Sequence, residues 1–164
     1  MIHNPVTLMR LHEEIGPVVA CNFDIAHMWY QGIDPIEAVR YLGPLIQHVH
    51  VKDTLIHEHN LRLKGFMDSG TPERPDERSW TYTLAGWGHD ATLWKEFVTT
   101  LRLIGYDYVL SVEMESEYID VQEGLEKSLE FLKPIVLQKS PGKRWWDIAG
   151  MERAGGLGEN RNKE

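Results

Sequence analysis

Cysteine is almost absent from this chain of 164 residues, which contains only Cys21. A single thiol can form neither an internal disulfide nor the cysteine cage of a structural zinc site, so both are excluded. No apolar run approaches the ~20 residues that span a bilayer. The first residues lack a basic segment followed by an apolar stretch, so no signal peptide is visible. These absences predict a cytoplasmic protein without a membrane partner.

Basic side chains are scarce relative to acidic ones. Seventeen Lys and Arg residues against 25 Asp and Glu residues give a formal net charge of -8. A nucleic-acid-binding protein needs a basic face toward the phosphate backbone, so this balance argues against nucleic acid as a partner. The phosphate-binding motifs G-x-G-x-x-G and Walker A are also missing, which leaves a nucleotide-binding fold without support.

The chain does contain a regular alternation of helix and strand signals. Four capping residues precede stretches with apolar residues at helical spacing, at Asn4, Asp34, Asp90 and Asp120. Short apolar or alternating segments lie between these helices, at residues 18–24, 48–52 and 108–114. Strands separated by helices predict an α/β protein with a parallel sheet and right-handed crossovers. A doubly wound sheet and part of a barrel both fit this order.

Two segments depart from the alternation. Residues 54–89 are polar and rich in proline, glycine and charge, which predicts a long loop that could act as a lid. Within it, Gly86-Trp87-Gly88 precedes the Asp90-capped helix and indicates a flexible turn, with phosphate binding at the helix N-terminus as the alternative. Residues 138–164 are rich in glycine and basic residues and predict a flexible tail.

Ionisable residues share one face of each strand-like segment near its C-terminal end. Asp24, His50 and Glu113 come from three successive segments, and a parallel barrel builds its active site at this end. His27 follows Asp24 by one helical turn, and Lys52 shares the face of His50. Two carboxylates and an imidazole without thiolate suit a divalent metal, namely Mn, Mg, Co or Zn. The structural alternative is that Asp24 and His27 cap a turn while His50 is a satisfied interior histidine.

Four stretches together resemble the xylose isomerase-like sugar phosphate isomerase/epimerase family over about residues 2–137: NFDIAHMWYQGIDPIEAVRYLG, HVHVKDT, GWGHD and LSVEMES. Their D-x-x-H, H-x-H-x-K-D and strand-end glutamate motifs stand in the family's order and spacing. The resemblance implies a TIM barrel whose metal ligands are a glutamate, an aspartate, a histidine and a final glutamate. Asp24, His50 and Glu113 match the last three, while His27 and Lys52 match positions that face the substrate.

The resemblance implies proton transfer alpha to the carbonyl of a sugar or sugar phosphate, through an enediolate that the metal stabilises. Glu113 would be both base and ligand, with Glu115 as the alternative ligand. Lys52 would donate to a substrate oxygen, and the alternative is an ion pair with Asp53 or Glu113. Three other functions stay open: a polyol dehydratase or a metal-dependent endonuclease of the same superfamily, or a non-catalytic partial barrel.

The matched motifs belong to the last strands of the family's barrel. A closed (β/α)8 barrel takes ~250 residues, and the earlier strands and the first ligating glutamate have no counterpart in this sequence. We therefore expect a partial barrel of roughly three βα units: residues 1–137 as the C-terminal half and 138–164 as the tail. Bare sheet edges invite pairing, so we also expect self-association or a need for a missing N-terminal half, and no turnover by the chain alone.

Overall fold

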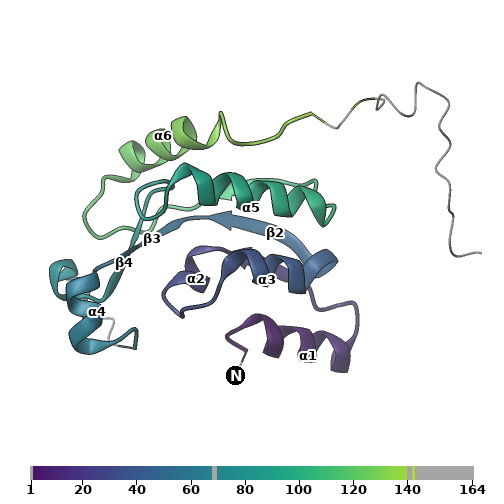
Figure 1. Cartoon of the computed structure of the whole chain (residues 1–164), viewed down its shortest axis with the longest axis horizontal. Helices are drawn as coiled ribbons and strands as arrows, with labels where there is room; N and C mark the ends of the chain where they lie inside the picture. The colour runs from purple at the N-terminus through teal and green to yellow at the C-terminus, as the bar shows by residue number, and fades with distance from the viewer. Residues whose placement is uncertain (1, 68–69, 140–141, 143–164) are drawn as a thin grey trace, which may run out of the picture.

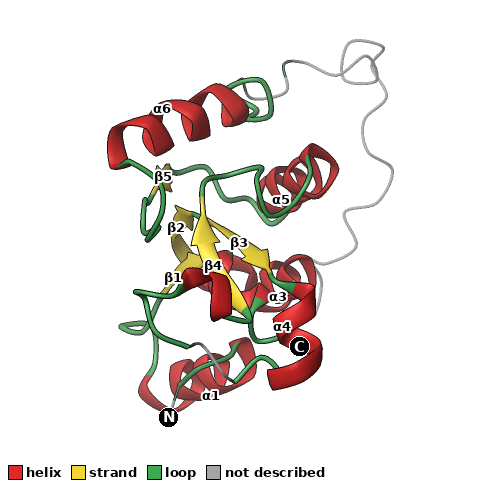
Figure 2. Cartoon of the chain, turned by 90° about the vertical axis from the view of Figure 1, so that its left-hand side faces the viewer, coloured by secondary structure: helices red, strands yellow, loops and turns green. Residues whose placement is uncertain are grey.

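Three strands form a parallel sheet in the order β1-β2-β5 in the computed structural model, which describes residues 2–67, 70–139 and 142. Helices precede, connect and follow these strands, as the sequence predicts. Figure 1 and Figure 2 show α1, α3, α5 and α6 stacked in that order, like part of the outer helix ring of a barrel. The expected α/β partial barrel is confirmed. The elements are α1 (Pro5–Ile15), β1 (Cys21–Asp24), α2 (Ala26–Trp29), α3 (Pro35–Leu42), β2 (Ile46–Val51), α5 (Ala91–Leu103), β5 (Leu110–Val112) and α6 (Val121–Leu132).

The helix starts agree with the caps read from the sequence. The side chain of Asn4 accepts a hydrogen bond from the backbone N–H of Thr7 at 2.9 Å. Asp34, Asp90 and Asp120 accept from backbone N–H groups at the starts of α3, α5 and α6 in the same way. Each such cap stabilises its helix by about 1 kcal/mol, because it satisfies an N–H that has no partner within the helix.

The expectation of a long loop over residues 54–89 is wrong. This segment contributes β3 (Asp53–Ile56), α4 (Glu58–Lys64), a short 3-10 turn (Pro75–Glu77) and β4 (Trp80–Thr83). β3 and β4 pair antiparallel, so that Thr54 faces Tyr82 and Ile56 faces Trp80. Aromatic and β-branched residues stabilise such cross-strand pairs. In Figure 1, β3 continues from the end of β2, which places this pair beside the end of the parallel sheet.

The core lies on one face of the parallel sheet. Phe23, Val49 and Val51 are buried there, and the ring of Phe23 stacks on that of Phe97 from α5 at a centroid distance of 6.1 Å. The other face is open by comparison: Asn22 is exposed, and His48 and Ser111 are half-buried. The sheet is thus covered by helices on the outside only, within the described part of the chain.

β1 and β5 begin later than the sequence predicts, whereas β2 begins two residues earlier than the predicted segment 48–52. Val18 and Val109, which were expected in strands, are exposed and lie outside β1 and β5. At the other end the ladder reaches slightly past β5, since the N–H of Glu113 donates to the carbonyl oxygen of Val51 at 3.0 Å. The expected tail lies outside the described residues except for 138, 139 and 142. Among the described residues, each helix is too short or too polar to cross a membrane.

Candidate metal centre

Strand register brings together three of the residues selected from the sequence. In the parallel ladder Asp24 is the partner of His50, and His50 is the partner of Ser111, two residues before Glu113. Asp24, His50 and Glu113 each offer one ligand atom, and these atoms all lie within 4.8 Å of one another. The convergence follows from the parallel arrangement, because the C-terminal ends of adjacent strands meet at one edge of the sheet.

The donor set fits a divalent cation. It consists of two carboxylates and one imidazole, a combination that suits Mn, Mg, Co or Zn. Ligand atoms bound at about 2.1 Å from one ion lie about 3 to 4 Å from each other, so only small side-chain rotations separate this group from a coordinating geometry. Asp24 is buried, and His50 and Glu113 are half-buried, so a cation would remain reachable from the open face of the sheet.

A lysine lies among the same carboxylates. The side chain of Lys52 is 1% exposed, and its Nζ lies 3.2 Å from Asp24 Oδ2, 2.8 Å from Glu113 Oε2 and 2.5 Å from Glu115 Oε2. The ring of Tyr82 lies beneath the ammonium, with its centroid 4.3 Å from Nζ. Three acceptors match the three N–H groups of an ammonium. Of the two ion-pair partners that the sequence left open for Lys52, the structure therefore selects Glu113.

Burial and pairing act against each other on the charges of this cluster. Burial raises the pKa of Asp24, although Lys52 and His27 both favour its ionised form. For Lys52, burial lowers the pKa, but hydrogen bonds to Glu113 and Glu115 outweigh it and the net shift is upward. For Glu113, burial favours a higher pKa, but the contacts with Lys52 and His50 outweigh burial, so the net shift of the pKa is downward. Lys52 is therefore charged and Glu113 ionised at neutral pH.

His27 links this cluster to two tyrosines that the sequence analysis missed. Its Nε2 lies 3.4 Å from Asp24 Oδ2, while its Nδ1 lies 2.8 Å from the hydroxyl oxygen of Tyr30 and 3.3 Å from that of Tyr82. Tyr30 stands three residues after His27, and this spacing predicts that both lie on one helix face. The contact between them is therefore predictable from the sequence. Tyr82 belongs to β4, within the segment that the sequence predicts as a loop, so its position has no local signal.

Asp53, next to Lys52, organises the loop before α5. Its carboxylate is fully buried, and Oδ2 accepts from the backbone N–H groups of Gly86, Gly88 and His89 at 3.0 to 3.1 Å. The phosphate alternative for this loop is wrong, because these N–H groups already bind a carboxylate. A side chain at Gly88 would place its Cβ 2.2 Å from the carbonyl oxygen of Thr54, so the close approach requires glycine.

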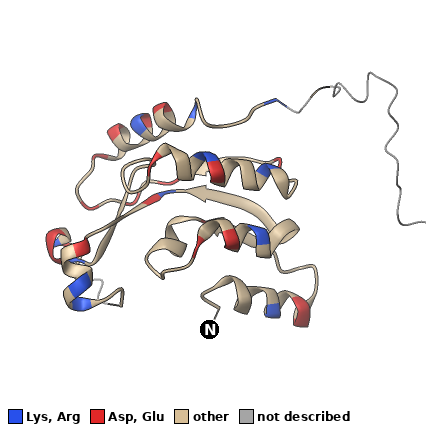
Figure 3. Cartoon of the chain, in the orientation of Figure 1, with Lys and Arg blue, Asp and Glu red and all other residues tan. Residues whose placement is uncertain are grey.

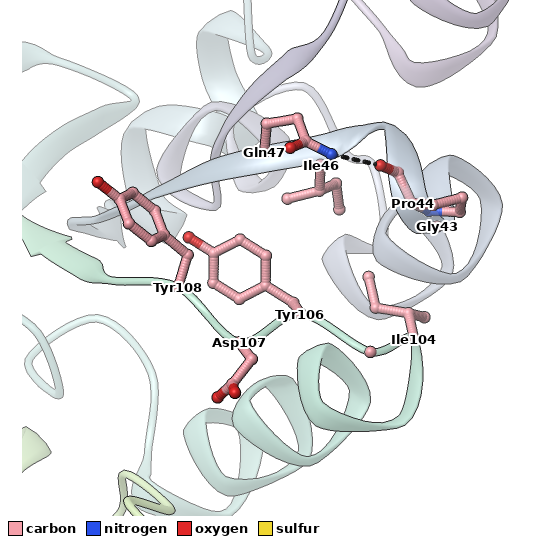
Figure 4. A pocket seen from close by; sticks show the side chains of 9 residues that line it. Gly43, Pro44, Ile46, Gln47, Ile104, Tyr106, Asp107 and Tyr108 are labelled. Atoms are coloured by element: carbon pink, nitrogen blue, oxygen red, sulfur yellow. Dashed lines mark hydrogen bonds between the residues drawn. The ribbon is translucent and has the colours of Figure 1, made fainter.

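A separate pocket of about 420 Å³ lies at the opposite end of β2. Figure 4 shows Tyr106 and Tyr108 on one side of it, and Gln47, whose amide donates to the carbonyl oxygen of Pro44 at 2.8 Å. Asp107 is the only carboxylate among the lining residues. Barrel enzymes place their chemistry at the C-terminal ends of the strands, so this pocket is not the counterpart of an active site.

Comparisons with known proteins agree with the fold. Residues 1–135 match the family described as xylose isomerase-like TIM barrel. The chain is 37% identical over 138 residues to "Uncharacterized protein YfiH" of Bacillus subtilis (strain 168), a match that covers 84% of this chain and 44% of that protein. A shorter match, 41% identical over 49 residues, is to 3-dehydroshikimate dehydratase of Bacillus anthracis and covers 30% of this chain and 18% of that protein.

A solved structure shares the arrangement of elements. The xylose isomerase domain protein from Planctomyces limnophilus superposes with a TM-score of 0.59 at 25% sequence identity. The superposition covers 80% of this chain and 43% of that one. The matched part of the chain thus covers less than half the length of each of these relatives.

Proposed function

Because the chain belongs to the xylose isomerase-like TIM barrel family, we propose that it carries the metal-binding part of an isomerase or epimerase that acts on a sugar or sugar phosphate. The observation that supports this proposal is the convergence of Asp24, His50 and Glu113 at the C-terminal ends of parallel strands. A divalent cation held by these three residues would polarise the carbonyl and hydroxyl oxygens of the substrate and stabilise the charge of an enediolate.

Glu113 is the residue to which we assign the proton transfer. Its carboxylate is one-third exposed on the open face of the sheet, and it is ionised at neutral pH because of Lys52. A carboxylate in this state can accept a proton from the carbon alpha to a carbonyl. In an isomerase it would return the proton to the adjacent carbon, whereas in an epimerase a second group on the opposite face would return a proton to the same carbon. Lys52 Nζ and His50 Nδ1 lie 2.8 and 3.3 Å from Oε2 of Glu113.

Lys52 and His27 are assigned to the substrate side of the site. Lys52 donates hydrogen bonds to Glu113 and Glu115 and pairs with Asp24, so we expect donation to a substrate oxygen to require that one of these contacts opens. The ring of His27 is 43% exposed beside Asp24, where it can meet a substrate hydroxyl. Both roles stay predictions of the sequence resemblance.

A dehydratase is the second candidate. The 49-residue similarity to 3-dehydroshikimate dehydratase favours it, and the same ligands and base would serve the elimination of water next to a carbonyl. Products distinguish the two: an isomerase or epimerase conserves the mass of the substrate, whereas a dehydratase releases water.

The open sheet supports a further part of the proposal, that another chain segment completes the site. β1 and β5 are the edges of the parallel sheet in the described residues, and Asn22 on its inner face is exposed. Edge strands of this kind pair readily with other chains. We expect sedimentation velocity to show self-association, or binding of a supplied N-terminal half from a longer relative; a monomer that turns over substrate would contradict this part.

Metal binding and proton exchange test the proposed function. Isothermal calorimetry should detect Mn²⁺ binding to the wild-type chain and a marked loss in His50→Ala, while the exposed His59 gives a matched control, His59→Ala, that binds as the wild type does. In a completed enzyme, Glu113→Gln should abolish exchange of the alpha proton with solvent deuterium, because an amide cannot accept that proton. Equal Mn²⁺ affinity of wild type and His50→Ala would contradict the site, and retained exchange would move the base to another residue, with Glu115 tested next.

A further inference from the structure

We propose that Lys52 is a built-in counter-ion of the metal centre: a divalent cation displaces its ammonium from Asp24 and Glu113, and Glu115 keeps hold of it. The inference rests on the metal centre proposed above and adds a mechanism that sets its affinity. Lys52 becomes a competitor of the metal, and Glu115 becomes a positioning residue that acts through Lys52.

Charge balance is the first support. Three carboxylates, those of Asp24, Glu113 and Glu115, surround the single ammonium of Lys52. Their formal charges sum to -2, and a divalent cation brings that sum to zero. Buried or partly buried charges of one sign need such compensation. Lys52 alone is therefore an incomplete counter-ion, and the excess of negative charge favours a cation in addition to it.

Shared carboxylates are the second support. Lys52 Nζ contacts Asp24 and Glu113, two of the three residues that converge as ligands. A cation bound to both carboxylates while Nζ stayed at 2.8 to 3.2 Å from them would lie within a few Å of the ammonium. Positive charges at that separation repel strongly, so the two cations compete for the same place.

Glu115 provides the position to which Lys52 retreats. Its Oε2 makes the shortest of the three contacts, 2.5 Å, and its side chain is 54% exposed, so it can follow the ammonium outward. The ring of Tyr82 supplies a second, uncharged support for Nζ at 4.3 Å. When a metal enters, Lys52 loses its contacts with Asp24 and Glu113 and keeps those with Glu115 and Tyr82.

Removal of Lys52 gives the first test. In calorimetric titrations of the full chain with Mn²⁺, Lys52→Met should bind about tenfold or more tightly than wild type, because the competing charge is gone. Lys127→Met removes an exposed lysine of α6 that pairs with Glu123, and it should bind as wild type does. Lys52→Met binding that is equal to or weaker than that of wild type would overturn the inference, since it would make Lys52 a support of the site.

Variants of Glu115 give a test that does not depend on the folding of Lys52→Met. Glu115→Asp keeps the negative charge but shortens the reach to Nζ, so Lys52 should bind Asp24 and Glu113 more firmly and the affinity for Mn²⁺ should fall several-fold. The affinity of Glu115→Gln for Mn²⁺ should fall at least as far as that of Glu115→Asp. Glu126→Gln, at an exposed position of α6, serves as the control. Affinity of Glu115→Asp equal to that of wild type would overturn the positioning role.

The two proposals fail in different ways. A wild-type chain that binds no Mn²⁺ would contradict the metal centre and with it the role of Lys52. Binding that is lost in His50→Ala but unchanged in Lys52→Met and Glu115→Asp would leave the metal centre standing and overturn this inference alone.

Discussion

Two adjacent residues, Lys52 and Asp53, bury opposite charges in opposite ways. Figure 3 shows basic and acidic residues next to each other at the C-terminal end of β2. The ammonium of Lys52 is surrounded by carboxylates that outnumber it, two of them partly exposed. The carboxylate of Asp53 is fully buried and accepts hydrogen bonds from backbone N–H groups, and His89 Nδ1 lies 2.7 Å from it.

The difference separates a reactive group from a structural one. The hydrogen-bonding capacity of Asp53 is filled by the loop before α5, by the backbone N–H of Thr54 and by the indole N–H of Trp94, so Asp53 gains nothing from a ligand. The Lys52 cluster keeps an excess of negative charge on an open face, so it gains from a cation. Burial alone would have assigned both residues the same role; the balance of charge around each distinguishes them.

The largest effect on the free energy of unfolding is expected from a substitution of Asp53. Asp53→Asn replaces a carboxylate oxygen by an amide that faces several N–H donors, which should lower the free energy of unfolding by about 3 to 5 kcal/mol. Urea denaturation measures it, and the exposed Asp107→Asn is the control. A loss below about 1 kcal/mol would show that the loop before α5 is held by other contacts.

Lys52→Met is expected to have a smaller effect on stability and one that depends on metal. Without metal it removes the ammonium that the three carboxylates share, which should cost about 2 to 3 kcal/mol, less than for a wholly buried pair because Glu115 is half-exposed. Saturating Mn²⁺ should recover most of this loss in urea denaturation. A loss of equal size with and without Mn²⁺ would contradict the role of Lys52 as a counter-ion.

The covered face of the sheet supplies a pH test. Burial raises the pKa of the Cys21 thiol from 9.0 to about 11. The unfolded chain therefore ionises first, and the contribution of Cys21 to stability is present below pH 9 and is lost as the pH rises toward 11. This loss should reach about 2 kcal/mol in wild type and be absent from the matched curve of Cys21→Ala. Parallel curves for the two proteins between pH 9 and 11 would contradict the burial of the thiol.

The smallest effect is expected on the open face. Asn22 is the neighbour of Cys21 on β1 but is exposed, and its amide nitrogen lies 3.4 Å from His50 Nε2. Asn22→Ala should change the free energy of unfolding by less than about 0.5 kcal/mol in thermal or urea denaturation. A loss above about 1 kcal/mol would indicate that the inner face is covered, in this chain or in its oligomer.

Local patterns predicted the parts of this structure that depend on neighbours in sequence. Asn4 and Asp34 cap helices because the N–H groups they bind are two or three residues away. Alternation along the strands placed Asp24 and His50 on one face, and the parallel register then brought them side by side. Family motifs added which of these residues to consider together.

The parts that escaped prediction depend on distant partners. β3 and β4 pair across more than twenty residues of polar sequence, so no hairpin signal was readable. Three of the donors to Asp53 are backbone N–H groups 33 to 36 residues away, and backbone groups carry no sequence signature. The contact between Lys52 and Glu115 likewise required the register of β2 against the segment after β5.

A crystal structure of the full chain with Mn²⁺ tests the metal centre most directly. The account predicts an anomalous difference peak within about 2.0 to 2.3 Å of donor atoms from Asp24, His50 and Glu113, with Lys52 Nζ moved toward Glu115. A peak bound by other residues, or none at saturating Mn²⁺ with Lys52 still between Asp24 and Glu113, would contradict it.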